Sequence, residues 1–209
     1  MPLLTHSPAG RDAVPVSEKR QRPVGCPGYS RTMTTSTLLN TDPQFLLDPR
    51  SLRRLESPIG RIELVGNGAA VTSLTIERGG HLPLEALPEH SDAVLDRAAT
   101  ELTEYFSGQR KTFEVPVVLT GTAFQMAVWA LLDELPFGAV ISYGEIGLAT
   151  GRPTAGRAVG GAIGANPVPI LVPCHRVLAS NSRITGYSAG NGVPTKVWLL
   201  DHEGIGHRA

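Results

Sequence analysis

The spacing of apolar residues divides the chain into an irregular N-terminal segment and a patterned remainder. Residues 1–48 mix Pro, Ser, Thr, Gly and scattered charge without apolar periodicity. Such a segment buries too little apolar surface to offset the entropy lost on ordering. We therefore expect residues 1–48 to form a flexible tail, and Met33 within it is a second candidate start.

Beyond the tail, residues 53–77 show the alternation that is typical of β-strands. Short apolar runs flank Asn67 and Gly68, a dipeptide that favours a tight hairpin turn. The stretch SPIG at 57–60 predicts an earlier turn. The pattern as a whole predicts an antiparallel hairpin.

Helical spacing follows in residues 91–108, where Ser91 is the predicted N-cap and Gly108 the predicted stop. The apolar face of this helix is formed by Leu95, Ala98, Ala99, Leu102 and Phe106. Residues 113–119 (FEVPVVL) predict one more extended strand. Together these elements predict a small α+β domain at 49–118.

After Gly121 the pattern becomes mainly helical, which predicts a second domain at 119–209. Thr122 is the predicted cap of a helix whose apolar face is formed by Phe124, Val128, Leu131 and Leu135. Ser142 and Glu145 have the spacing of a capping box, and Gly151 lies past the end of that short helix.

A further helix is predicted to start at Pro153 and Thr154 and to end at 166–167. Two short helices joined by a tight Gly/Pro turn predict a helix-turn-helix. The last predicted helix has Pro194 in its first turn and Gly204 after its end.

Composition excludes several classes of protein. The 19 basic and 19 acidic residues cancel, which argues against binding nucleic acid through a global field. Two cysteines, Cys26 and Cys174, cannot build a disulfide framework and form no Cys-x-x-Cys metal pair. No apolar run is long enough for a membrane helix, and no export signal is visible. These features predict a reduced protein of the cytoplasm.

Charge is uneven along the chain, however. Residues 146–190 contain four arginines (Arg152, Arg157, Arg176 and Arg183) and no lysine, aspartate or glutamate. The second helix of the predicted helix-turn-helix is also rich in Gly and Ala, which lowers its helix propensity. Two interpretations remain open: tight helix packing, or close approach to a nucleic-acid groove with Arg157 projecting into it.

Cys174 follows the apolar run PVPILVP and precedes His175 and Arg176. A free cysteine is often a buried small hydrophobe, but a neighbouring histidine or arginine also lowers the pKa of a reactive thiol. In an extended strand Cys174 and His175 would face opposite sides. A reactive pair therefore requires a turn or short helix at Pro173, or a water between the two side chains. Candidate acids to orient the histidine are Glu145, Asp201 and Glu203, and their spacing selects none of them.

Six ordered blocks resemble the O6-alkylguanine-DNA alkyltransferases, also called methylated-DNA–protein-cysteine methyltransferases. They are FGAVISYGEIG, GRPTAGRAVGGAIGANP, PVPILV, PCHRV at 173–177, GYSAG and WLLDHEG. The resemblance covers roughly 121–204. The resemblance implies an α+β fold with a small antiparallel, ribonuclease-H-like N-terminal domain. It also implies a mainly helical C-terminal domain with a winged-helix-like helix-turn-helix.

The resemblance also implies residue roles. Cys174 is similar to the thiol that accepts the alkyl group, His175 to the base acting through water, and Glu203 to its orienting acid. Tyr143 is similar to the proton donor to guanine, and Asn166 to the residue tying the recognition helix to the active-site turn. Arg157 is similar to the finger that replaces the flipped nucleotide, with the DNA-facing positions Thr154, Ala155, Ala158 and Gly160 around it. The base pocket would be formed by Val177, Tyr187, Ser188 and Ala189.

The implied activity is a single-turnover transfer from O6-alkylguanine in double-stranded DNA, with O4-alkylthymine left open as a second substrate. No cofactor or metal is expected, and the expected partner is DNA in the cytoplasmic nucleoid. A monomer is the default, with clustering on DNA left open. The main alternative is a lesion sensor that binds alkylguanine without reacting. A Cys-His hydrolase is disfavoured because nothing marks an oxyanion hole.

Overall fold

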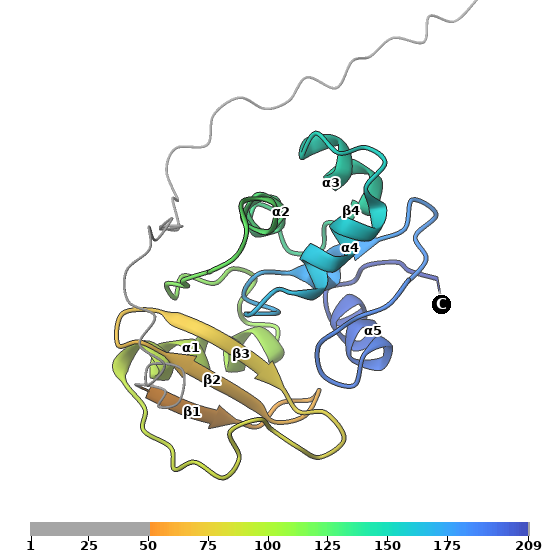
Figure 1. Cartoon of the computed structure of the whole chain (residues 1–209). Coiled ribbons are helices and arrows are strands. Elements are labelled where there is room, and N and C mark those ends of the chain that lie inside the picture. Colours follow the sequence, from red (N-terminus) through yellow and green to blue (C-terminus); the bar gives the residue numbers. More distant parts are fainter. Residues whose placement is uncertain (1–50, 209) are drawn as a thin grey trace, which may run out of the picture.

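The computed structural model describes residues 51–208. The predicted tail at 1–48, including Cys26, lies outside these residues. Figure 1 shows a sheet with one helix on its face in the N-terminal half, and a set of short helices above it in the C-terminal half. The α+β class expected from the sequence is confirmed. No helix among residues 51–208 is long and apolar enough to cross a membrane.

The N-terminal sheet has three antiparallel strands in the order β1-β2-β3: β1 (Ser51–Leu55), β2 (Ile62–Gly66) and β3 (Val71–Ile76). The predicted hairpin turn is confirmed, because Gly68 has φ 85° and Asn67 Oδ1 accepts from the amide of Ala70 at 2.9 Å. The turn at 57–60 is also present, with the Gly60 amide 3.2 Å from the Ser57 carbonyl.

Helix α1 (Ala93–Phe106) packs on this sheet with Leu95, Ala98 and Leu102 fully buried. The prediction of Ser91 as N-cap is wrong. The cap is Asp92, whose carboxylate accepts from the Leu95 amide at 2.8 Å, while Ser91 Oγ donates to Asp96. A carboxylate at this position satisfies a free helix amide and also suits the positive end of the helix dipole.

The predicted strand at 113–119 is wrong: the segment makes a single bridge, between Val117 and Val71. The Val71 amide donates to the Pro116 carbonyl and the Val118 amide donates to the Val71 carbonyl, both at 2.9 Å. Pro116 has no amide hydrogen, so a continuous ladder cannot extend through it. The apolar alternation was correct, but the proline limited its pairing.

The C-terminal half contains α2 (Ala123–Asp133), α3 (Tyr143–Ala149), α4 (Gly156–Gly164) and α5 (Val193–His202). The capping box of Ser142 and Glu145 is confirmed, and Thr122 caps α2 as predicted. The buried residues of α2 are Val128, Trp129 and Leu132, a face rotated from the predicted one. The rotation has a clear cause, because Trp129 Nε1 donates to the carbonyl of Ala162 in α4 at 2.8 Å.

Helices α3 and α4 form the predicted helix-turn-helix, but α4 starts later than expected. Pro153 and Thr154 belong to the turn, and Ala155 is the N-cap of α4. The turn is closed by the Arg152 amide, which donates to the Gly147 carbonyl at 2.7 Å. Below it, β4 (Ile141–Ser142) pairs in parallel with β5 (Val177–Leu178).

One buried cluster of apolar residues runs through both halves. Tyr105 of α1 joins them, because its fully buried ring makes an edge contact with Phe137 at 6.1 Å and with His202 of α5 at 4.9 Å between centroids. This packing places the Tyr105 hydroxyl, which belongs to the N-terminal half, beside the end of α5.

Candidate active site

Cys174 lies in a short 3₁₀ helix, η2 (Cys174–Arg176), that begins directly after Pro173. The Arg176 amide donates to the Pro173 carbonyl at 3.0 Å, which closes the turn. A turn or short helix at Pro173 was one of the two ways expected for Cys174 and His175 to cooperate, the other being a water between them, and the short helix is present. The turn brings both side chains into the interior, where Cys174 is only 2% exposed.

The thiol of Cys174 borders a cavity of about 570 Å³. The cavity is lined by Tyr143, Gly156, Arg157, Gly160, Ile163, Gly164, Cys174, Thr185, Gly186, Tyr187, Ser188 and Lys196. Sγ of Cys174 lies 3.8 Å from Oη of Tyr187. Burial raises the pKa of the Cys174 thiol, while hydrogen bonds from Asn166 and Tyr187 and the charge of Lys196 act in the opposite direction.

His175 is fully buried, and its Nε2 lies 2.9 Å from Oε1 of Glu203. The other two candidate acids are engaged elsewhere: Glu145 caps α3, and Asp201 pairs with His207 at 3.0 Å. Burial lowers the pKa of His175, against the opposing effect of the Glu203 hydrogen bond. A neutral ring that donates from Nε2 to the carboxylate leaves a lone pair on Nδ1, which has no hydrogen-bond partner among residues 51–208.

Glu203 collects donors from four sources. Besides His175, Arg176 contacts both carboxylate oxygens at 2.8 Å, the Tyr105 hydroxyl donates at 2.8 Å, and the Gly138 amide donates at 3.1 Å. Burial alone would raise the pKa of Glu203, but hydrogen bonds from His175 and Arg176 hold it well below its usual range. The carboxylate is therefore ionised throughout the physiological pH range.

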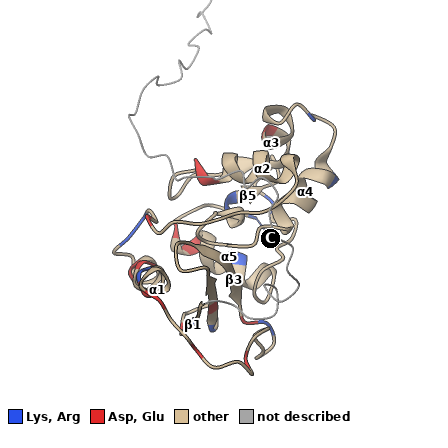
Figure 2. Ribbon diagram, turned by 60° about the vertical axis from the view of Figure 1, so that its left-hand side comes forward, with Lys and Arg blue, Asp and Glu red and all other residues tan. Residues whose placement is uncertain are grey.

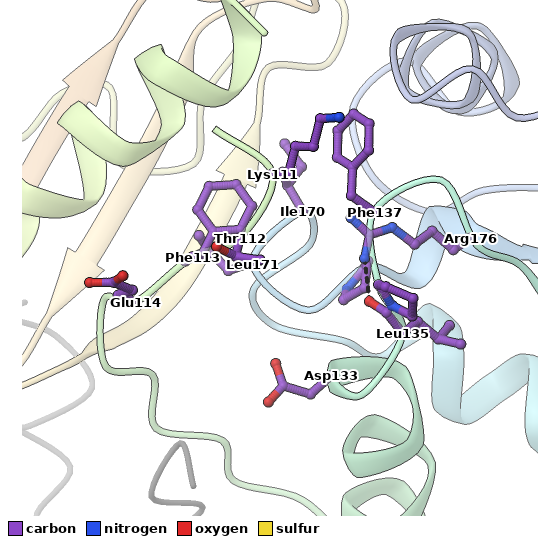
Figure 3. A pocket seen from close by; sticks show the side chains of 12 residues that line it. Lys111, Thr112, Phe113, Glu114, Asp133, Leu135, Phe137, Ile170, Leu171 and Arg176 are labelled. Atoms are coloured by element: carbon purple, nitrogen blue, oxygen red, sulfur yellow. Dashed lines mark hydrogen bonds between the residues drawn. The ribbon is translucent and has the colours of Figure 1, made fainter. Parts of the chain in front are cut away.

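Arg176 is not available to DNA, which corrects the expectation from local charge. Its side chain is buried, and its Nη1 donates to the Leu135 carbonyl at 2.6 Å. Figure 3 shows this hydrogen bond in a second pocket, which both residues line. Three of the four arginines of 146–190 are exposed: Arg152, Arg157 and Arg183. In Figure 2 acidic residues gather mainly on the N-terminal half, while the α3–α4 turn and the start of α4 carry basic ones.

Two more predicted site residues connect the elements around the cavity. Asn166 follows α4, donates from Nδ2 to the Val172 carbonyl at 2.8 Å and accepts from the Val168 amide at 3.1 Å. It therefore ties the end of α4 to the segment that leads into Cys174. Tyr143, the first residue of α3, accepts from Thr185 Oγ1 at 3.0 Å and borders the cavity.

The residues expected to meet DNA lie on α4 and in the turn before it. Arg157, Thr154 and Ala158 are exposed, and Ala155 and Gly160 are half-buried. A Cβ added at Gly156 or Gly161 would meet nothing within 4 Å among the described residues. These two glycines therefore do not serve tight helix packing, which was one of the two interpretations left open by the sequence.

The predicted base pocket is only partly assembled around the thiol. Tyr187 and Ser188 line the cavity of Cys174. Val177 is fully buried in β5 and is not among the lining residues, and Ala189 borders a neighbouring groove of about 550 Å³ that shares Gly164 and Ser188 with the cavity.

Comparison with known proteins shows to which family the chain belongs. Residues 53–119 match the model for the "6-O-methylguanine DNA methyltransferase, ribonuclease-like domain", and residues 123–205 match that for the "6-O-methylguanine DNA methyltransferase, DNA binding domain". The chain belongs to this family. It is 40% identical over 151 residues to a methylated-DNA–protein-cysteine methyltransferase of Mycobacterium tuberculosis, covering 72% of this chain and 90% of the relative. The constitutive Bacillus subtilis relative is 39% identical over 157 residues, which covers 73% and 94%.

Solved structures agree with this assignment. The M. tuberculosis O6-methylguanine methyltransferase matches with a TM-score of 0.65 at 38% identity, covering 73% of this chain and 92% of that one. A structure from the same organism in complex with DNA matches with a TM-score of 0.66 at 39% identity and the same coverage. The family carries out DNA repair by transferring alkyl groups from DNA to a cysteine of the protein itself.

The site of this methyltransferase contains a buried lysine that the sequence interpretation missed. Lys196 of α5 is 1% exposed and lines the cavity of Cys174; its Nζ donates to the Val177 carbonyl at 2.5 Å. Burial lowers its pKa to about 8. A signal was present, because Lys196 and Leu199 of α5 and its C-cap Glu203 have helical spacing, and two charges on a buried face indicate a site.

Proposed function

We propose that Cys174 is the residue that accepts the alkyl group from O6-alkylguanine in double-stranded DNA. The observation that carries this proposal is the position of the thiol: it borders a cavity large enough for a base, and the next residue of the same short helix, His175, forms a buried pair with Glu203. His175 would take the thiol proton through one water at Nδ1, and Glu203 would stabilise the resulting imidazolium.

The transfer balances without a cofactor. The thiolate of Cys174 attacks the alkyl carbon, a new S–C bond forms, and the bond between that carbon and guanine O6 breaks. The electron pair of the broken bond stays on the guanine, and the hydroxyl of Tyr143 donates a proton to it. The thioether product is stable and no group in the cavity offers a route to cleave it, so each molecule acts once.

Access to the reacting oxygen requires extrusion of the base, because a stacked base pair hides it; unstacking costs a few kcal/mol. We infer that the exposed face of α4 enters the minor groove and that Arg157 occupies the space of the extruded base. With three exposed arginines rather than four, DNA affinity would depend only weakly on salt.

Some finer properties extend the proposal. We infer that the protein is a monomer. We also infer that it meets its substrate in the cytoplasmic nucleoid, because the thiol must stay reduced to react. O4-alkylthymine is a second substrate to test, since it presents an alkyl carbon on a ring oxygen in the same way.

Mapping the methylated residue tests the proposal directly. The full chain is incubated with duplex DNA containing O6-methylguanine, then digested and analysed by mass spectrometry. We expect one added CH₂ per molecule, on the peptide containing Cys174, with none on Cys26. No added mass with lesion binding retained would favour the sensor alternative, and methylation at another residue would refute the assignment of Cys174.

A second test concerns Lys196, whose positive charge lowers the pKa of Cys174. Replacing Lys196 by Met removes that charge, so the thiolate becomes less favourable and the pKa of Cys174 rises. We expect the rate–pH profile of methyl transfer to move up by about one pH unit, and the rate at neutral pH to fall about tenfold. Lys111→Met is the matched control, because Lys111 is exposed and is not among the residues that line the cavity of Cys174. An unmoved profile would show that the charge does not act on the thiol.

A further inference from the structure

The loop at 186–192 forms one wall of the cavity around Cys174. Tyr187 and Ser188 face this cavity, and the Tyr187 hydroxyl lies 3.8 Å from the thiol. The loop backbone has a low intrinsic barrier to rearrangement, because glycines at 186, 190 and 192 have φ of 151°, 53° and 76°. Its position therefore depends on contacts made from outside the loop.

Arg78 of the N-terminal half makes two of those contacts, while Thr195 accepts from the Asn191 amide and Lys196 lies near the Gly186 carbonyl. Nε of Arg78 donates to the Gly190 carbonyl at 2.8 Å and its Nη2 donates to the Ser188 carbonyl at 2.9 Å. The next amide, of Gly79, donates to Asn191 Oδ1 at 3.1 Å. One planar guanidinium thus spans two main-chain acceptors of the loop, a geometry that fixes position as well as distance.

The backbone that carries Arg78 is itself well fixed. Arg78 follows β3 and pairs with His81 across a two-residue turn, with both amide–carbonyl distances at 3.1 Å. Gly79 and Gly80 supply the positive φ values, 58° and 85°, that such a turn requires. Arg61 fastens the turn from the other side, because its Nη2 donates to the Gly80 carbonyl at 3.0 Å.

The loop also rests directly on the end of β3. A Cβ added at Gly190 would lie 3.0 Å from Cγ2 of Ile76 and 2.7 Å from Oγ1 of Thr195. Ser188 borders both the cavity of Cys174 and the groove of about 550 Å³, which Ala189, Gly190 and Arg78 also border. A shift of the loop toward that groove would widen the cavity on its Tyr187 side.

We propose that Arg78 is a positioning residue that holds the 186–192 loop closed against the cavity of Cys174, so that an extruded alkylated base is retained beside the thiol. This inference rests on the proposed function. Arg78 touches neither the thiol nor the His175–Glu203 pair, so its effect falls on capture of the extruded base and not on proton transfer. The N-terminal half thereby takes part in recognising the lesion.

Single-turnover kinetics of Arg78→Met tests this inference. We expect the concentration of O6-methylguanine duplex that gives half the maximal rate to rise about fivefold to tenfold, as loss of charge-assisted hydrogen bonds would cause. The rate at saturation should change less than about twofold, because the thiol and its base are untouched. Arg78→Lys, which can reach one carbonyl but not both, should recover part of the loss.

Arg53→Met is the control for the lost charge, because Arg53 lies in β1 and pairs with Asp96, away from the loop. Affinity for undamaged duplex should be the same for both variants. An equal loss of affinity for undamaged and methylated duplex in Arg78→Met would overturn the inference, since it would make Arg78 a phosphate contact. The inference would also be overturned if Arg78→Met and Arg53→Met reached half the maximal rate at the same concentration of O6-methylguanine duplex.

Hydrogen exchange separates this inference from the proposed function. Amides of 186–192 should exchange faster in Arg78→Met than in the wild type or in Arg53→Met, without any DNA present. Unchanged exchange would contradict the clamp even if the wild type transfers methyl groups. A wild type that transfers none would refute the proposed function, and with it the role of Arg78 in capture.

Discussion

Cys174→Ser is expected to bind duplex DNA containing O6-methylguanine as tightly as the wild type and to accept no methyl group. A hydroxyl fits the buried site and can keep its contact with Tyr187, so folding and base capture should persist. It has a far higher pKa than a thiol, and the neutral His175 cannot generate its anion. We expect the transfer rate to fall by at least about 10⁴-fold, the order of loss seen when a covalent nucleophile is removed.

The measurement pairs gel-shift affinity with intact mass after prolonged incubation. Cys26→Ser is the matched control, because it removes the other cysteine of the chain and should keep full activity. Methyl transfer at a rate within about tenfold of the wild type would contradict the assignment of Cys174 as acceptor. Loss of binding together with transfer would show that the serine disturbs the cavity, and Cys174→Ala would then be used to measure binding.

Glu203→Gln is expected to lower both the free energy of unfolding and the transfer rate. Glutamine keeps the size of the side chain, but it leaves the buried guanidinium of Arg176 without a counter-charge. Removing one partner of a buried ion pair costs about 3–5 kcal/mol. The variant also weakens the acceptor of His175, so the transfer rate should fall by about 10²- to 10⁴-fold.

Urea unfolding and single-turnover transfer, measured at a temperature where the variant is folded, check these two effects. Asp201→Asn is the control, because it removes a carboxylate near the same end of α5 whose side chain is 66% exposed; its cost should stay below about 1 kcal/mol. Equal urea midpoints for the two variants would contradict the structural role of Glu203.

Wild type and Glu203→Gln are expected to differ in stability by an amount that depends on pH, because the pKa of Glu203 is lowered in the folded protein. A carboxyl whose pKa is lower in the folded than in the unfolded state contributes stability that is fully present above its unfolded value, about 4.3. That contribution is lost as the pH falls through the folded pKa. We therefore expect the free energies of unfolding of the two proteins to differ most near neutral pH, and this difference to shrink in strong acid.

Sequence patterns predicted several local features of the fold correctly. The Asn67-Gly68 turn, the Ser142–Glu145 capping box and the short helix considered at Pro173 are all present, because each depends on residues close together in the chain. Glu203 was left undecided by spacing and was singled out only by the resemblance. Its 2.9 Å contact with His175 depends on how α5 packs, which no local pattern encodes.

The features that the sequence interpretation missed are the long-range ones. Local charge does not indicate that Arg176 is buried against Glu203, and helical spacing at 91–108 does not indicate that Tyr105 donates to Glu203. The rotated face of α2 follows from one Trp129 hydrogen bond to α4. In each case tertiary packing decided between options that were equal at the level of local propensity.

The hydrogen bond from Tyr105 to Glu203 limits how this protein can be rearranged by recombination. The carboxylate that orients the proposed base is held partly by a phenol encoded 98 positions upstream, in the segment that carries the sheet. A gene fusion that joined the helical half to an unrelated partner would inherit Cys174 and Arg157 but lose this donor. The two halves are therefore expected to be inherited together, and a chimaera would need a compensating donor before its active site matched that of the parent.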